Sequence, residues 1–156
     1  MNTKNKKLKI AIAGLGFGKK VHLEALRESD YLIPVAIYHY EKKQKSLLEK
    51  ETGLDFFHDW DDLIKCSEID GIIIATPPES RFKLAKQALE NNKNLLLEKP
   101  VSISSFEIEE LQRISLINNL SVCVDFEYRA VPLFLPMNTN SRIFWGLIYC
   151  PLTNLI

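Results

Sequence analysis

Cysteine is scarce in this 156-residue sequence, and the net charge is zero. The three cysteines, Cys66, Cys123 and Cys150, are odd in number and far apart. This spacing excludes a disulfide framework and a cysteine metal cluster, so we predict a cytoplasmic protein with no bound metal. Twenty Lys and Arg residues balance twenty Asp and Glu residues, so the chain lacks the positive charge typical of nucleic-acid-binding proteins.

Long apolar runs are also missing. The run at 10–13 follows several lysines, as in a signal peptide, but it is short and Lys19 and Lys20 interrupt the sequence soon after it. No stretch reaches the roughly 18 apolar residues that a membrane span needs. We therefore predict that 10–13 is a buried strand and that the protein has no membrane partner.

Short apolar runs alternate with helix-like segments. The expected strands are 8–13, 31–40, 55–58, 69–76, 95–97 and 120–126; the expected helices are 20–29, 41–52, 60–66, 79–91 and one that carries Ile108, Leu111 and Ile114. Such alternation is typical of βαβ units, and the near-continuous apolar run at 72–75 suits a strand covered on both faces. The sequence therefore predicts an α/β fold: a doubly wound parallel Rossmann sheet of about six strands with helices on both faces.

Local signals predict three helix boundaries. Gly53 ends the helix at 41–52, and Asp59 is positioned to cap the helix at 60–66. Ser104 and Glu107 have the spacing of a capping box at the start of the last helix.

The alternation stops after about residue 132. Prolines at 132, 136 and 151 punctuate the remaining stretch, and an apolar segment at 143–149 has no helix after it to cover it. We predict a dinucleotide-binding domain at 1–132 and an irregular or aberrant tail at 133–156; the alternative for this tail is the start of a missing second domain. An uncovered apolar segment favours self-association through this tail.

The glycine-rich loop Gly14-Leu15-Gly16-Phe17-Gly18 lies between a predicted strand and a predicted helix. In that setting Gly14 permits a tight turn, and Gly16 lets the backbone approach a pyrophosphate at the helix N-terminus. The fingerprint places its third glycine at position 19, where this chain has Lys19. We predict that helix packing differs here or that Lys19 faces solvent and attracts phosphate.

The end of the second strand bears on cofactor choice. An acid there binds the ribose hydroxyls of NAD, but this chain has His39, with Glu41 two residues later. His39 can meet either a ribose or a 2′-phosphate, and Lys42 and Lys43 follow closely. The cofactor is therefore NADP or NAD, with a lean toward NADP.

Two further turns end the fourth and fifth strands: Ala75-Thr76-Pro77-Pro78 and Glu98-Lys99-Pro100. With the glycine loop, His22 and the run at 70–74, these turns resemble the Gfo/Idh/MocA family (glucose–fructose oxidoreductase and inositol dehydrogenase). The resemblance covers residues 8 to about 132, in order and at the right spacing. The Glu-Lys-Pro triplet is its most specific part.

The resemblance implies an NAD(P)-dependent oxidoreductase that transfers hydride to or from a sugar, a polyol or a related carbonyl compound. It places Lys99 near the nicotinamide and the substrate, where a lysine can donate a hydrogen bond to a reacting oxygen. It implies that Glu98 orients the loop, that the Lys99–Pro100 bond is often cis, and that Glu127 and Arg129 lie beside the nicotinamide.

The chain departs from the family in two ways. Arg81 stands where relatives often have a histidine, and the Asp-x-x-x-His acid–base pair of the usual substrate domain is not in this sequence. We therefore expect a truncated form that is inactive alone and takes a sugar or polyol only if a substrate domain is supplied. A non-catalytic nucleotide-binding module that docks through its C-terminal apolar segment is the alternative. A methyltransferase, which also has a glycine-rich first loop, is disfavoured by the two later turns.

Overall fold

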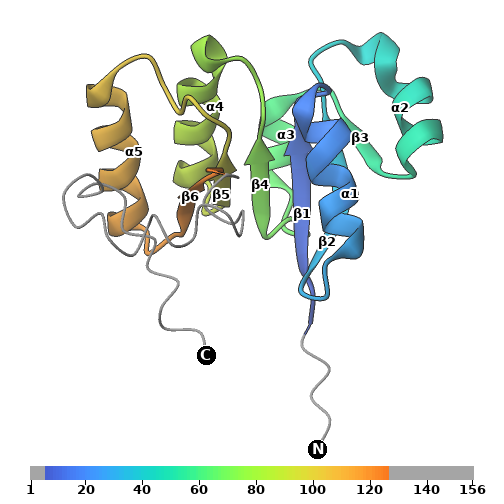
Figure 1. Cartoon of the computed structure of the whole chain (residues 1–156), viewed down its shortest axis with the longest axis horizontal. Coiled ribbons are helices and arrows are strands. Elements are labelled where there is room, and N and C mark those ends of the chain that lie inside the picture. Colours follow the sequence, from blue (N-terminus) through green and yellow to red (C-terminus); the bar gives the residue numbers. More distant parts are fainter. Residues whose placement is uncertain (1–5, 127–156) are drawn as a thin grey trace, which may run out of the picture.

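The computed structural model describes residues 6–126, and these form one six-stranded parallel sheet in the order β3-β2-β1-β4-β5-β6 (Figure 1). The strands are β1 (Leu8–Ala13), β2 (Leu32–Tyr38), β3 (Asp55–Phe57), β4 (Gly71–Ile74), β5 (Asn94–Leu97) and β6 (Val122–Val124). The predicted doubly wound sheet is confirmed. The predicted tail at 133–156 and the boundary at 132 lie outside the described residues.

Strands β1 and β4 form the centre of the sheet. Ile12 of β1 pairs with Ile37 on one side and with Ile73 of β4 on the other. All four residues of β4 are buried, because helices cover both of its faces. The β1–β2 register shifts between Ile10 and Ala11, just beyond the point where Pro34, which has no backbone donor, enters the ladder.

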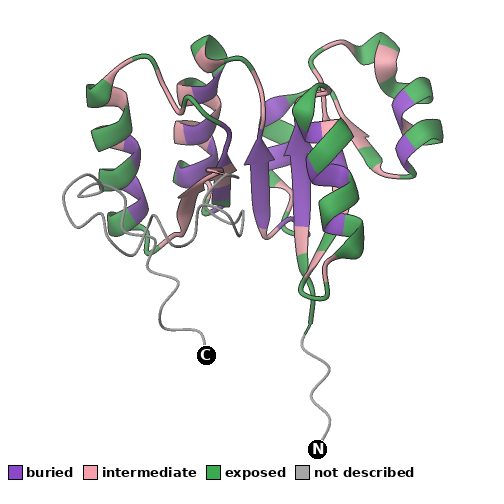
Figure 2. Cartoon of the chain, in the orientation of Figure 1, coloured by how far each residue is buried: buried purple, intermediate pink, exposed green. Residues whose placement is uncertain are grey.

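The helices form one layer on each face of the sheet. They are α1 (Leu23–Glu28), α2 (Lys45–Thr52), α3 (Trp60–Lys65), α4 (Pro78–Glu90) and α5 (Ser105–Ile117). Helices α3, α4 and α5 pack on the face that carries Ile72 and Ile74, and α1 packs on the face that carries Ile73. Figure 2 shows the buried residues gathered in the central strands and along one side of each long helix.

All three predicted helix boundaries are confirmed, since α5 begins directly after Ser104. The Asp59 carboxylate accepts from the backbone N–H groups of Asp61 and Asp62, and Gly53 ends α2 with φ +71°. The predicted capping box is wrong, because Ser104 makes no side-chain cap bond. Glu107 instead accepts from the hydroxyl of Ser102, which also binds the backbone N–H of Ser104 at 3.0 Å.

The first helix starts earlier than predicted. A π-helical turn at Gly18–His22 precedes α1, so the glycine loop runs directly into helical structure. Cys66 and Cys123 form no disulfide within the described residues, and Cys150 lies outside them. Within residues 6–126, no helix has the length and apolar character needed to cross a bilayer.

Candidate dinucleotide-binding site

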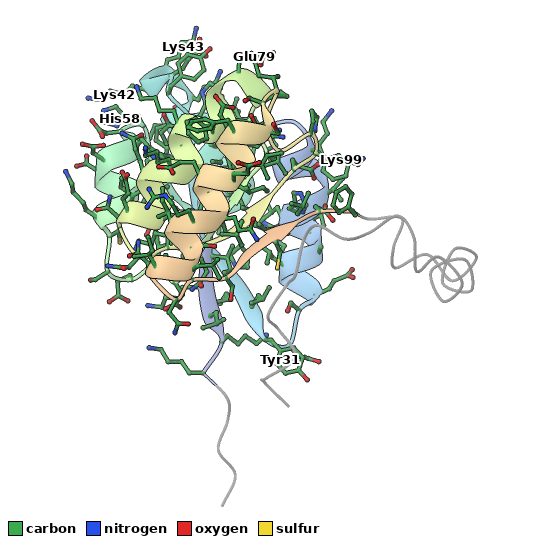
Figure 3. The ribbon with its side chains drawn as sticks, turned by 90° about the vertical axis from the view of Figure 1, so that its left-hand side faces the viewer. Tyr31, Lys42, Lys43, His58, Glu79 and Lys99 are labelled. Carbon is green, nitrogen blue, oxygen red and sulfur yellow. The ribbon has the colours of Figure 1, made fainter. Side chains whose placement is uncertain are left out.

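The loops that leave β1, β4 and β5 lie next to one another because these three strands are neighbours in the sheet. The arrowheads of β1 and β4 point upward in Figure 1, and β5 is parallel to β4. In Figure 3, Lys99 and Glu79 lie toward this upper end, whereas Tyr31, which precedes β2, lies at the lower end. The predicted glycine loop, the Thr-Pro-Pro turn and the Glu-Lys-Pro turn therefore meet at one edge, where open parallel sheets bind ligands.

Gly14 and Gly18 permit close packing of the glycine loop against the end of β4. Gly14 has φ +119°, and a Cβ atom there would lie 2.5 Å from the carbonyl oxygen of Ala75. A Cβ atom on Gly18 would lie 3.0 Å from Cγ2 of Ile12 and 3.2 Å from Cβ of Ala75. Gly18 thus provides the close helix–strand contact one position earlier than the fingerprint predicts.

The middle of the loop is open. A Cβ atom on Gly16 would meet nothing within 4 Å, so the space beside this backbone is free for a ligand. Leu15 is half-buried, and Phe17 is exposed with its ring edge-to-face against His22 at 5.3 Å between centroids. An open space beside a glycine at the start of a helical segment fits a pyrophosphate.

Lys19 is already paired. Its ammonium bonds to the carboxylate of Glu51 in α2, with the Lys19 side chain 30% exposed. From the sequence we predicted either altered helix packing or a solvent-facing Lys19 at this position. The early packing of Gly18 corresponds to the first of these predictions. A phosphate would have to compete with Glu51 for Lys19.

At the end of β2 the candidate acid is turned toward its own loop. The Glu41 carboxylate accepts from Gln44 at 3.3 Å and pairs with Lys43 at 3.3 Å, and these contacts lower the pKa of Glu41. The backbone N–H of Glu41 donates to Nδ1 of His39 at 3.2 Å, and the His39 ring lies against Tyr40 with centroids 4.6 Å apart. His39 therefore presents a fixed ring at this strand end.

The turn after β4 presents one unsatisfied polar atom. The backbone N–H of Ala75 donates to Ala13 at 2.8 Å, which ties β4 to β1 up to the strand end. The Thr76 hydroxyl is buried and has no hydrogen-bond partner among the described residues. Pro77 precedes α4 and Pro78 occupies its first turn, where a missing N–H is tolerated. An orphaned hydroxyl beside the glycine loop fits a site that is completed by a ligand.

Glu98 is buried at the end of β5. Its carboxylate accepts from Nε2 of His22 at 2.7 Å and from the backbone N–H of Lys99 at 3.2 Å. The Lys99–Pro100 peptide bond is cis, as the resemblance implied. The bond from the Lys99 N–H restrains this turn, and the orienting role expected of Glu98 stays a prediction.

Arg81 was identified in the sequence only as a departure from the family. It is 3% exposed, and its guanidinium donates to the carbonyl oxygens of Thr76, Glu98 and Pro100. Burial lowers the pKa of Arg81, and the carboxylate of Glu98 opposes that shift. A signal was present in the sequence: Arg81 shares the buried face of α4 with residues four and seven positions later, Ala85 and Ala88.

His22, Glu98 and Asp125 also have the donor set of a metal site. Their ligand atoms lie within 4.8 Å of one another, and Nε2 of His22 is 3.7 Å from Oδ2 of Asp125. The direct His22–Glu98 hydrogen bond satisfies these two groups without an ion. The expectation of no metal stays a prediction.

A shallow hollow of about 600 Å³ adjoins Lys99. Its lining is mainly apolar and comprises Lys99, Pro100, Val101, Ser102, Ile108, Val124 and Phe126. The other two predicted residues of this region, Glu127 and Arg129, lie outside the described residues.

The strand order, the glycine loop and the three converging turns define a dinucleotide-binding Rossmann domain. Residues 8–126 match the model of the oxidoreductase family with an NAD-binding Rossmann fold, Gfo/Idh/MocA. The chain belongs to this family, so it is the NAD(P)-binding domain of an oxidoreductase.

Curated relatives extend well beyond the matched region. An uncharacterised oxidoreductase of Synechocystis is 34% identical over 131 residues, which are 83% of this chain and 35% of the relative. Glucose-6-phosphate 3-dehydrogenase of Bacillus subtilis is 31% identical over 121 residues, which are 78% of this chain and 34% of that enzyme. The chain thus spans about a third of the length of these relatives.

Solved structures agree on the fold. Scyllo-inositol dehydrogenase of Lactobacillus casei, solved with NAD(H) and scyllo-inositol, superposes with a TM-score of 0.77 at 25% identity. The match covers 86% of this chain and 40% of that one.

Proposed function

We propose that this chain supplies the dinucleotide to an oxidoreductase that acts on a sugar, a polyol or a related carbonyl compound. The observation that carries the proposal is the meeting of three turns at one sheet edge: the open Gly16, the orphaned Thr76 hydroxyl and the Lys99 turn. Relatives named as glucose-6-phosphate and inositol dehydrogenases support the substrate class.

Each predicted residue then has a definite task. Three sets of residues form the dinucleotide cradle: Gly14, Leu15, Gly16, Phe17, Gly18 and Lys19 in the first loop, Ala75, Thr76, Pro77 and Pro78 in the second, and Glu98 and Lys99 in the third. The helical start at Gly18 favours the pyrophosphate charge beside Gly16. Lys99 donates a hydrogen bond to the reacting oxygen of the substrate, and Glu127 and Arg129 contact the nicotinamide.

We propose further that residues 1–132 form the cofactor-binding domain and that the 156-residue chain does not turn over alone. About two-thirds of each curated relative lies outside the match, and a closed substrate pocket needs more surface than one sheet edge provides. Absorbance of the reduced nicotinamide, followed over a panel of sugars and polyols, tests this. Steady turnover that disappears in Lys99→Ala would contradict it.

The proposed cofactor preference is for NADP over NAD. His39 stands at the end of β2, and Glu41 is engaged by Gln44 and Lys43 rather than aimed at a ribose. Ligand at about ten times its dissociation constant adds roughly 1.4 kcal/mol, which raises Tm by about 3–6 °C in a domain of this size. Thermal shifts at equal cofactor concentrations should be at least as large with NADP. A clearly larger shift with NAD would reverse the preference.

The compartment we propose is the cytoplasm. Cys66 and Cys123 form no disulfide in the part of the chain that the structure describes, which suits a reducing environment.

A further inference from the structure

The three loops of the site are joined beneath their surface by buried polar side chains. Arg81, on the first turns of α4, and His22, at the end of the π-helical turn, approach Glu98 from two elements. The exposed fractions of these three residues are 3% for Arg81, 6% for His22 and 8% for Glu98. Neither Arg81 nor His22 belongs to the predicted dinucleotide cradle.

Arg81 fixes the backbone of two turns at once. Nη1 donates to the carbonyl oxygens of Glu98 and Pro100, which flank Lys99, and Nη2 donates to the carbonyl oxygen of Thr76. A guanidinium holds its donors in one rigid plane, so these three acceptors are held in a fixed mutual geometry. Such charge-assisted bonds in a buried site are stronger than neutral ones.

His22 fixes the same turn through its side chain. Nε2 of His22 donates to Oε1 of Glu98 at 2.7 Å, and Oε2 of Glu98 accepts from the backbone N–H of Lys99 at 3.2 Å. Glu98 is thus held by its carbonyl oxygen and by its carboxylate. The backbone of Lys99 lies between two restrained neighbours and is itself a donor in the network.

We propose that Arg81 and His22 are positioning residues, which fix the Glu98–Pro100 turn so that Lys99 is held at the nicotinamide half of the dinucleotide site. This inference rests on the proposed function. Among the described residues, the hydrogen bonds of the guanidinium go to backbone carbonyl oxygens, and no atom lies within 4 Å of a Cβ atom placed on Gly16. Loss of Arg81 should therefore weaken the nicotinamide half of the site and spare the pyrophosphate half.

Two probes separate these halves: NADH, and ADP-ribose, which lacks the nicotinamide ring. If the phosphorylated cofactor binds more tightly, NADPH and 2′-phospho-ADP-ribose take their place. Titrations use the 156-residue chain, with the fluorescence of the reduced nicotinamide as a second signal for burial of the ring. Circular dichroism and Tm establish that each variant is folded at the titration temperature.

Arg81→Met should weaken NADH binding by about tenfold, while ADP-ribose affinity changes by less than about twofold. Arg81→Lys keeps the charge without the rigid plane and should fall between Met and the wild type. Arg113→Met is the matched control, because Arg113 is an exposed arginine on α5 that pairs only with Glu110 among the described contacts. It should change neither affinity.

His22→Leu provides an independent route if Arg81→Met does not fold. It removes the donor to Glu98 and should also lower the ratio of NADH affinity to ADP-ribose affinity. His22→Gln retains a donor and should restore part of this ratio. An unchanged ratio in the folded variants, or an equal loss for both ligands, would overturn the inference. A wild-type chain that binds neither ligand would instead overturn the proposed function on which it rests.

Discussion

The amino ends and the carboxyl ends of the strands each contain a buried cation, and the two cations have different surroundings. Lys93 lies just before β5, at the amino ends of the strands, and donates to the carbonyl oxygens of Cys66 at 2.7 Å and Ile69 at 2.8 Å. Arg81 lies at the carboxyl ends and donates to three carbonyl oxygens. Burial lowers the pKa of both side chains.

The difference lies in what surrounds each cation. Lys93 holds the connection between α3 and β4 through its bonds to the carbonyl oxygens of Cys66 and Ile69. Beside Arg81 there are an open glycine loop, an orphaned threonine hydroxyl and the Lys99 turn. We propose that the same device, a buried cation on backbone carbonyls, stabilises the fold at one end and supports the dinucleotide site at the other. Substitutions at the two ends should therefore separate stability from binding.

The largest effect on stability should come from Gly14→Ala. Its φ of +119° is strained for a residue with a Cβ atom, and that atom would lie 2.5 Å from the Ala75 carbonyl oxygen. We expect a loss of about 2–4 kcal/mol in the free energy of unfolding, measured by urea denaturation.

Two further alanine substitutions separate the backbone strain expected at Gly14 from its close contact with Ala75. Gly53→Ala, with φ +71° and nothing within 4 Å, should cost about 1 kcal/mol through the backbone alone. Gly16→Ala has neither a positive φ nor a close contact and should stay within about 0.5 kcal/mol of the wild type. Equal costs at positions 14 and 16 would mean that the packing of the loop against β4 is misassigned.

Lys93→Met should destabilise the amino end without affecting the site. It leaves the carbonyl oxygens of Cys66 and Ile69 without this donor, which should cost about 1–3 kcal/mol. Lys65→Met is the control, at an exposed lysine that pairs with Asp61 across one helical turn, and it should be close to neutral. If folded Lys93→Met also binds the cofactor more weakly, and its lower stability does not account for that loss, the proposed division between the two ends would be wrong.

The smallest effect should be the pH dependence at Glu110 on α5, away from both ends. Hydrogen bonds from Arg113 and Lys86 lower the pKa of Glu110 from 4.5 to about 2. Because the pKa is lower in the folded chain, the stabilisation is complete above pH 4.5 and is lost as the pH falls toward 2. The difference in Tm between the wild type and Glu110→Gln should be small at pH 7 and should shrink over that range. A difference that grows as the pH falls would contradict the assignment.

The fold could be predicted from the sequence because its signals are local. The apolar run of β4, the cap at Asp59 and the glycine at 53 each specify one element, and alternation of elements specifies the parallel sheet. The capping box at Ser104 failed because a competing hydroxyl, Ser102, lies two residues away and binds Glu107 first.

The site could be predicted only in part, because its supporting contacts connect distant segments. The open space beside Gly16 follows from a motif, whereas the pairing of Lys19 with Glu51 spans 32 positions and the bond from His22 to Glu98 spans 76. In the sequence Arg81 stands out only as a departure from the family pattern. Its place on the buried face of α4 could be predicted, but its three acceptors could not, because they are backbone oxygens that carry no sequence signature.

The most direct test of the central claim is a calorimetric titration of the wild-type chain and of Gly16→Val with NADPH and NADH. We predict that the wild type binds at least one of them and that Gly16→Val binds neither, because the valine side chain fills space that is open beside Gly16. The variant should keep the wild-type circular dichroism spectrum. A folded Gly16→Val chain with unchanged affinity would show that the dinucleotide does not bind at this loop.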